Sequence, residues 1–240
     1  MAEHSGMVDP VIFEFLQAKV DQESAISEEL QEIVTTLEKQ VRSAKAILSR
    51  AHSTPVAEVG NVITAAESSI RYEIDSIEKL SKAASEHPYY KWQFKWTHQV
   101  QDTIFTILFC GWLGGYTGEG EEAKPGKLLT IEEVGKIMKV PVNLKDRDAF
   151  HITIQEYLLS LVSLLDELAR LARNCVTLGD YRRPLQISNF LKDVQAGFLV
   201  LNLKNDILRR RSDGIKYKVK EVEDVVYDLS LRNLLPAADT

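Results

Sequence analysis

A ten-residue segment, YYKWQFKWTH, has the side-chain types that binding of single-stranded nucleic acid requires. It combines five aromatic residues with two lysines and one histidine. Aromatic rings stack on bases, and cations attract the phosphate backbone. On a continuous helix, Lys91, Lys95 and His98 would share one face, and Trp92 and Trp96 the neighbouring face. The pattern predicts a binding surface. The alternative is that the tryptophans pack in the core and the lysines are solvated.

A second basic cluster lies near the C-terminal end. From position 204 to position 220 the chain has seven Lys or Arg residues against two Asp residues, a net charge of +5. The residues that we select from this cluster are Arg209, Arg210, Arg211, Lys216 and Lys218. They would attract phosphates. Two alternatives remain: a solvated face, or ion pairs with the acidic run 221–224 of a neighbouring subunit.

Carboxylates decide whether the chain can cleave RNA by itself. Metal-dependent hydrolysis needs two or three acidic groups that converge on Mg²⁺. The best placed acids are Asp166 and Glu167, and we keep Glu167 as a weak catalytic candidate. An ion pair of Glu167 with Arg170 or Arg173 is the favoured alternative. No spacing typical of a metal site, a phosphate-binding glycine loop or a nucleophile is present.

Composition restricts the class of protein further. The chain has 240 residues, of which 45% are hydrophobic and 27% charged, with a net charge of −6. These values are typical of a soluble globular protein. No run of 18 apolar residues and no secretory signal is present, so we expect no membrane partner. Cys110 and Cys175 lie in apolar contexts, which predicts buried free thiols.

The elements that position these residues are all expected to be helices. Apolar residues recur every three or four positions, while glycine and proline are sparse at 12 and 7. We predict a tail at 1–8, a helical domain at 9–232 and a flexible tail at 233–240. The expected helices include 10–51, 89–115 and 148–177, in a single-domain all-α bundle of about seven helices. The first of them has an apolar seam from Leu30 to Leu48 at alternating spacings of four and three. A capping box is expected at Thr130 and a helix break at Gly179.

The C-terminal quarter resembles the translin branch of the translin/TRAX family. The matching elements are Gly179-Asp180-Tyr181, Arg183-Pro184-Leu185, Ile187-Ser188, Gly197-Phe198, the run from Leu201 to Asp206, Asp213-Gly214, Lys216-Tyr217 and the run from Val225 to Ser230. The resemblance continues more weakly upstream to about residue 10.

This resemblance implies a hollow closed homo-oligomer, an octamer, that binds single-stranded RNA or DNA. In it, Lys91, Gln93 and Lys95 fall in the family's basic nucleic-acid-binding element. The family's second basic segment corresponds to about Gly60 to Arg71, which here has almost no positive charge. The resemblance also implies a TRAX-type partner, an endoribonuclease complex that degrades small-RNA passenger strands and processes tRNA fragments, and a location in cytoplasm and nucleus.

The catalytic branch of the family supplies three acids for Mg²⁺. An ungapped alignment of this sequence with that branch places Leu108, Gly111 and Ser163 at those positions, so all three acids are absent. The resemblance therefore implies a non-catalytic, RNA-holding subunit without a cofactor, with Mg²⁺ at the partner. Two alternatives stay open: a homo-oligomeric Mg²⁺-dependent ribonuclease, and a helical protein-assembly scaffold without a specific RNA role.

Overall fold

A computed structural model describes residues 10–116, 124–204 and 206–235 of the chain. Its helices are α1 (Pro10–Leu48), α2 (Val59–Ala84), α3 (Tyr89–Trp92), α4 (Thr97–Leu113), α5 (Ile131–Met138), α6 (Ile154–Thr177), α7 (Arg182–Val200), α8 (Ile207–Ser212) and α9 (Ile215–Leu231). Short 3₁₀ turns occupy Ser49–His52, Val56–Glu58 and Gln93–Lys95.

The predicted all-α class is confirmed. Within the described ranges, seven α-helices have eight residues or more, and α3 and α8 are shorter. The same residues contain no β-strand, only an isolated bridge between Val142 and Ile152. None of the described helices is both long and apolar enough to cross a membrane.

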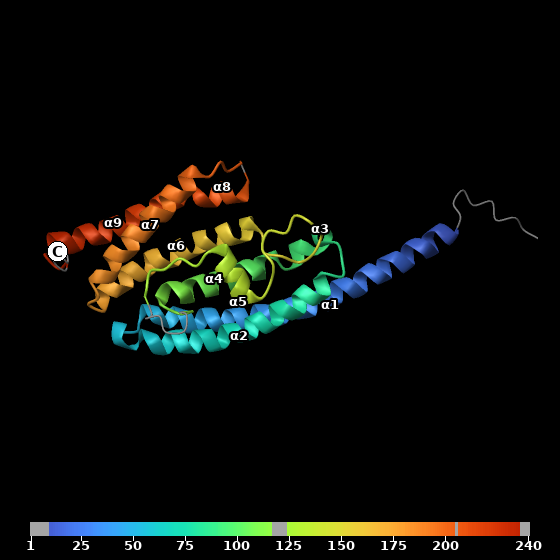
Figure 1. The fold of residues 1–240 in the computed structure, drawn as a ribbon, viewed down its shortest axis with the longest axis horizontal. Helices are drawn as coiled ribbons and strands as arrows, with labels where there is room; N and C mark the ends of the chain where they lie inside the picture. Colours follow the sequence, from blue (N-terminus) through green and yellow to red (C-terminus); the bar gives the residue numbers. More distant parts are fainter. Residues whose placement is uncertain (1–9, 117–123, 205, 236–240) are drawn as a thin grey trace, which may run out of the picture.

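Three layers of helices form the body of the molecule (Figure 1). The long helices α1 and α2 pack against each other, α4 packs on both of them and on α6, and α7 and α9 cover the other side of α6. The apolar seam predicted in the first helix is the reason for the first contact. All six of its residues are buried: Leu30, Val34, Leu37, Val41, Ala44 and Leu48.

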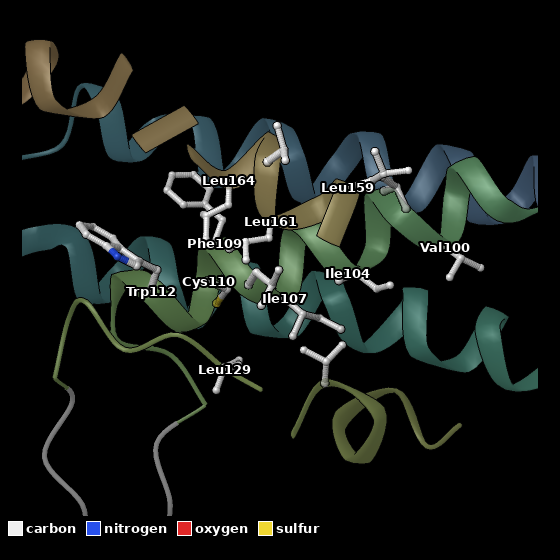
Figure 2. Close-up of a cluster of buried hydrophobic side chains, with 14 of the residues drawn as sticks. Val100, Ile104, Ile107, Phe109, Cys110, Trp112, Leu129, Leu159, Leu161 and Leu164 are labelled. Carbon is white, nitrogen blue, oxygen red and sulfur yellow. The ribbon is translucent and has the colours of Figure 1, made fainter. Parts of the chain in front are cut away.

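Helix α4 is the centre of the core, and its whole second half is buried (Figure 2). Phe109 and Trp112 project from it among leucines of α6 and Leu129. Each such ring buries about 150–250 Å² of surface, so these two contribute strongly to the core. Cys110 and Cys175 are buried free thiols, as predicted, and burial raises the pKa of both.

Two predicted helix bounds are wrong. The third helix does not run continuously from 89 to 115, because the 3₁₀ turn Gln93–Lys95 separates α3 from α4. The helix predicted from 148 begins at Ile154, where Thr153 and Glu156 form a reciprocal capping box. That box satisfies the first free backbone N–H groups and fixes the start of α6. The predicted break at Gly179 is present, with φ of +77°.

The predicted tail 1–8 and residues 236–240 of the predicted tail 233–240 lie outside the described residues. Within the described part, Asn233 and Leu234 donate backbone hydrogen bonds to Ser230 and Leu229 at the end of α9. The first turns of α1 extend beyond the body of the bundle (Figure 1).

Candidate nucleic-acid interface

The aromatic and basic segment sits at the junction between α3 and α4, where the chain changes direction. Pro88 precedes α3, and Tyr89 donates its backbone N–H to Asp148 Oδ1 at 3.1 Å. The Tyr89 ring stacks on His151 with centroids 4.6 Å apart. The loop before α6 therefore fixes the start of this segment from one side.

The structure divides the aromatic residues into two groups. Trp92 and Trp96 are buried, with 6% and 1% of their surface exposed, whereas Tyr90 and Phe94 are 73% and 68% exposed. Trp96 packs against Phe150 at 5.6 Å between centroids. The Trp92 ring is covered by protein in this structure, which fits the alternative that the tryptophans pack in the core.

Tyr90 and Phe94 are the rings that a base can reach, and the sequence pattern did not select them. A continuous helix would have placed Trp92 and Trp96 on one side together. Exposed and buried aromatic residues alternate along a short helix and a 3₁₀ turn. Their spacing does not follow the period of a regular helix. The only sequence signal was the density of aromatic residues between the lysines.

The lysines of the segment remain partly exposed. Lys91 forms an ion pair with Glu23 of α1 and lies 5.4 Å from the Trp92 ring centroid. Lys95 lies over the exposed Phe94 ring at 5.8 Å, and no ion pair to Lys95 is found among the described residues. Lys95 with Phe94 thus presents a cation and an apolar ring together, as a nucleotide requires.

Gln93 and His98 are both exposed, but they differ in their contacts. His98 Nδ1 lies 3.5 Å from Asp102 Oδ2, and Asp102 in turn pairs with Lys45 at 2.7 Å. His98 therefore belongs in part to a polar chain on α4. The 3₁₀ turn also removes the regular helical spacing that would have aligned His98 with Lys91.

The second basic cluster makes ion pairs within its own chain. Arg211 and Lys218 each lie 3.8 Å from Asp166 of α6, and Arg209 pairs with Asp213 at 3.2 Å. Lys216 lies over the Tyr217 ring at 5.0 Å, and Arg210 is exposed. These pairs reduce the positive charge available to phosphates, which favours the interpretation as a solvated, partly neutralised face.

Glu167 makes its closest contact with His52, a partner the sequence did not indicate. Glu167 Oε1 lies 2.6 Å from His52 Nε2 and 3.5 Å from Arg170 Nη1, while Asn174 contacts the other ring nitrogen of His52 at 3.0 Å. The hydrogen bond with His52 lowers the pKa of Glu167 despite its partial burial. Arg173 instead pairs with Glu221 at 2.7 Å.

Replacement of Glu167 by alanine is expected to cost about 1–2 kcal/mol of folding stability, because a charge-assisted hydrogen bond to buried His52 is lost. Because the pKa of Glu167 is lowered in the folded protein, its contribution to folding stability depends on pH. The contribution is present above the unfolded pKa near 4.5 and is lost as the pH falls through the folded pKa. Denaturant unfolding of the wild type and the variant at pH 7 and pH 4 measures the size of the loss and its dependence on pH. An equal loss at the two pH values would contradict a role of the charged Glu167 carboxylate in this hydrogen bond.

The three positions matched to the catalytic acids do not converge on one site. Ser163 lines a polar cleft of about 380 Å³ between α1, α4 and α6, where Lys45, Asp102 and Asp166 also lie. Leu108 and Gly111 are buried and are not among the residues that line this cleft. A Cβ at Gly111 would come within 2.6 Å of a Leu129 methyl group.

The three positions hold no acid and do not line this cleft together, whereas the ligands of one ion must meet in one cavity. The acids that are present do not replace that triad. In the part of the chain that the structure describes, no group of three His, Cys, Asp or Glu side chains is placed to hold a metal ion. The donor set of the described residues therefore does not fit Mg²⁺.

Fold and site together define an all-helical bundle with an exposed aromatic and basic segment at a helix junction. The chain belongs to the Translin family, whose sequence profile matches residues 25–233, and this confirms the resemblance. It is 35% identical to Translin of Gallus gallus over 225 residues, 93% of each chain, and 35% identical to Translin of Homo sapiens over 223 residues, 92% of each chain.

Other relatives share less of the sequence. Translin-associated protein X of Rattus norvegicus is 30% identical over 118 residues, which is 47% of this chain and 41% of that protein. Among solved structures, apo-NeC3PO has a TM-score of 0.66 at 14% identity, and the chain in the AfC3PO–duplex RNA complex has 0.63 at 15%. Each match covers 92% of this chain and 98% of the other, and shows the same fold.

Proposed function

We propose that this protein is a single-stranded RNA- and DNA-binding subunit of a closed oligomer. The observation that carries the proposal is the exposed pair Phe94 and Lys95, next to Tyr90 and Lys91, on a chain of the Translin family. Bases stack on the two rings, and the lysines contact phosphates. The relation to a structure that contains duplex RNA supports a role with nucleic acid.

We further propose that the subunit holds RNA for a catalytic partner related to Translin-associated protein X. The partner would provide the Mg²⁺ ligands of an endoribonuclease for small RNAs and tRNA fragments, in cytoplasm and nucleus, and the homo-oligomer would be an octamer. Two observations support this division of roles. The acid positions of the triad hold Leu, Gly and Ser, and the described residues offer no metal-binding group of acids.

Incubation of end-labelled single-stranded RNA with the purified protein, with Mg²⁺ or with EDTA, tests this division. We expect retention of the RNA on a filter in both conditions and intact RNA on a denaturing gel. Cleavage that EDTA abolishes and that comigrates with the oligomer would instead establish the alternative, a ribonuclease in its own right. A Glu167→Ala variant then shows whether that carboxylate takes part.

Removal of the exposed rings should weaken binding without changing its salt dependence. The double variant Tyr90→Ala/Phe94→Ala loses two stacking contacts of about 1–3 kcal/mol each, so the affinity for single-stranded RNA should fall at least about 10-fold. The lysines remain, so the slope of log Kd against log salt should be retained. Filter binding between about 50 and 300 mM salt measures both the affinity and the slope.

The matched control is Tyr72→Ala/Tyr227→Ala, which removes two equally exposed rings from α2 and α9. An unchanged affinity for the Tyr90/Phe94 variant would exclude these rings from the interface. A changed slope would show that the substitutions also displaced the lysines.

A further inference from the structure

The first part of α1 is an apolar helix that no other part of the described chain covers. Ile12, Phe13, Phe15, Leu16 and Val20 are 49–63% exposed. In Figure 1 this arm, residues 11–22, continues α1 away from the bundle. The contact of α1 with the body begins next to it, where Glu23 pairs with Lys91.

The arm leaves large apolar side chains in water. It continues the longer helix α1, so its helical form is propagated from the body of the molecule and is not nucleated alone. The two phenylalanines together expose on the order of 250 Å² of apolar surface. Patches of this kind mark interaction sites, so the arm is suited to a partner surface.

The shape of that surface follows from the helical positions. At 100° per residue, the arm's apolar side chains are spread over more than half of its circumference, interrupted by Lys19 and Gln22, and the remaining side is polar, with Glu14, Gln17 and Asp21. A flat contact would leave part of such a wide apolar surface in water. A groove, which contacts a helix on both flanks, fits it better.

The same chain has an apolar groove with an open top. It has a volume of about 500 Å³ and lies between α6, with Leu158 and Leu161, and α7, with Phe190, Val194 and Phe198. Helix α7 beyond it continues apolar into Leu199 and Val200, which are 81% and 86% exposed.

Gly197 supplies a second, independent observation at this groove. It lies within α7, where glycine costs roughly 1 kcal/mol relative to alanine. Its φ is not positive, and a Cβ built on it meets no atom within 4 Å. The fold of the single chain therefore does not require this glycine. Gly197 also lines the groove, which Gly60 does not, so its lack of a side chain leaves room there for the backbone of an entering helix.

We propose that the arm of one subunit docks in the α6–α7 groove of a second copy of this chain. Within one chain the contact is excluded, because α1 is one continuous helix that leads the arm away from α6 and α7 (Figure 1). The contact joins two different surfaces, so it is heterologous and generates a ring when the rotation closes. It rests on the oligomer in the proposed function and specifies how its subunits join.

Filling the groove tests the proposal without removing any contact inside the subunit. Gly197→Leu should dissociate the assembly at least 10-fold more readily in sedimentation velocity over a concentration series, while circular dichroism and thermal unfolding of the subunit are retained. Gly60→Leu is the matched control, since Gly60 is also an exposed helical glycine with no atom near its Cβ. Its assembly should match the wild type.

Cross-linking identifies the two surfaces directly. Leu16→Cys combined with Gly197→Cys should give covalent multimers with a short bismaleimide, because the native Cys110 and Cys175 are buried. Neither single variant should cross-link. Dimers from Leu16→Cys alone would show that arms pair with arms, and would overturn the proposal.

Different outcomes of these experiments would exclude the groove contact and the oligomer on which it rests. An oligomeric wild type whose size Gly197→Leu does not change, with no Leu16–Gly197 cross-link, overturns the groove contact alone. A wild type that is monomeric at every concentration overturns the assembly itself. Binding of RNA is measured separately and stays informative in both cases.

Discussion

Reversal of charge at Lys91 and Lys95 is expected to weaken binding of single-stranded RNA on the order of 100-fold at physiological salt. Two charge-assisted contacts to phosphates would be lost, at about 1.5 kcal/mol or more each. Because each phosphate contact to a single strand contributes about 0.7 to the slope of log Kd against log salt, the slope should fall by about 1.4. Filter binding of Lys91→Glu/Lys95→Glu over a salt series measures both.

The control for this variant is Lys39→Glu/Lys79→Glu, which makes the same change of net charge at exposed positions of α1 and α2. It should weaken binding only slightly through the long-range field. If the Lys91/Lys95 variant keeps its affinity and its salt slope, the α3–α4 junction is not the interface. The alternative of a helical assembly scaffold without an RNA role would then be favoured.

Replacement of Glu73 by glutamine is expected to stabilise the protein, and increasingly so as the pH rises. Glu73 is fully buried between α2 and α4, and its described neighbours include the Thr106 hydroxyl, which donates to Oε2 at 3.0 Å. Oε1 has no hydrogen-bond partner in the structure. Desolvation raises the pKa of Glu73 to about 8, with smaller opposing effects of Thr106, Thr103 and Lys45.

The sign follows from proton binding. The folded protein holds a proton on Glu73 at pH values where the unfolded chain has released it, so folding stability declines from pH 4.5 to about 8. The amide of Glu73→Gln does not titrate and accepts the same Thr106 hydrogen bond. Its advantage over the wild type should therefore be small at pH 5 and about 2–4 kcal/mol at pH 8.

Denaturant unfolding at pH 5, 6, 7 and 8, at one protein concentration, measures this difference. Glu78→Gln on the same helix is the control, because hydrogen bonding with Lys82 lowers the pKa of Glu78 at the surface. That variant should show no gain at high pH. Parallel stability curves for wild type and Glu73→Gln would mean that the Glu73 carboxyl is charged, or solvated, in the folded protein.

The local signals in the sequence were sufficient for the fold class. The seam from Leu30 to Leu48 is buried at every position, since an apolar repeat of three and four can only be covered by a packed helix. The capping box at Thr130 and the break at Gly179 lie where the sequence indicated. Such signals act within one turn of the chain, so their effect does not depend on the rest of the fold.

The candidate interface could be predicted from sequence only as a segment. Its position, between residues 89 and 98, follows from the unusual density of rings and cations. Which rings face the solvent was decided by the 3₁₀ turn and by Phe150 and His151, which cover one side of the segment from more than 50 positions away. Base stacking was accordingly assigned to Trp92 when the exposed rings are Tyr90 and Phe94.

The sequence by itself determined the family, the helices and the absence of acids at the three matched positions. Each of these depends only on residue types and short spacings along the chain. Only the tertiary structure decided that Glu167 pairs with His52 and that Arg211 and Lys218 pair with Asp166. These contacts join residues 45 to 115 positions apart. The partner of a side chain at such a separation depends on how the helices pack, so it cannot be predicted from a local sequence pattern.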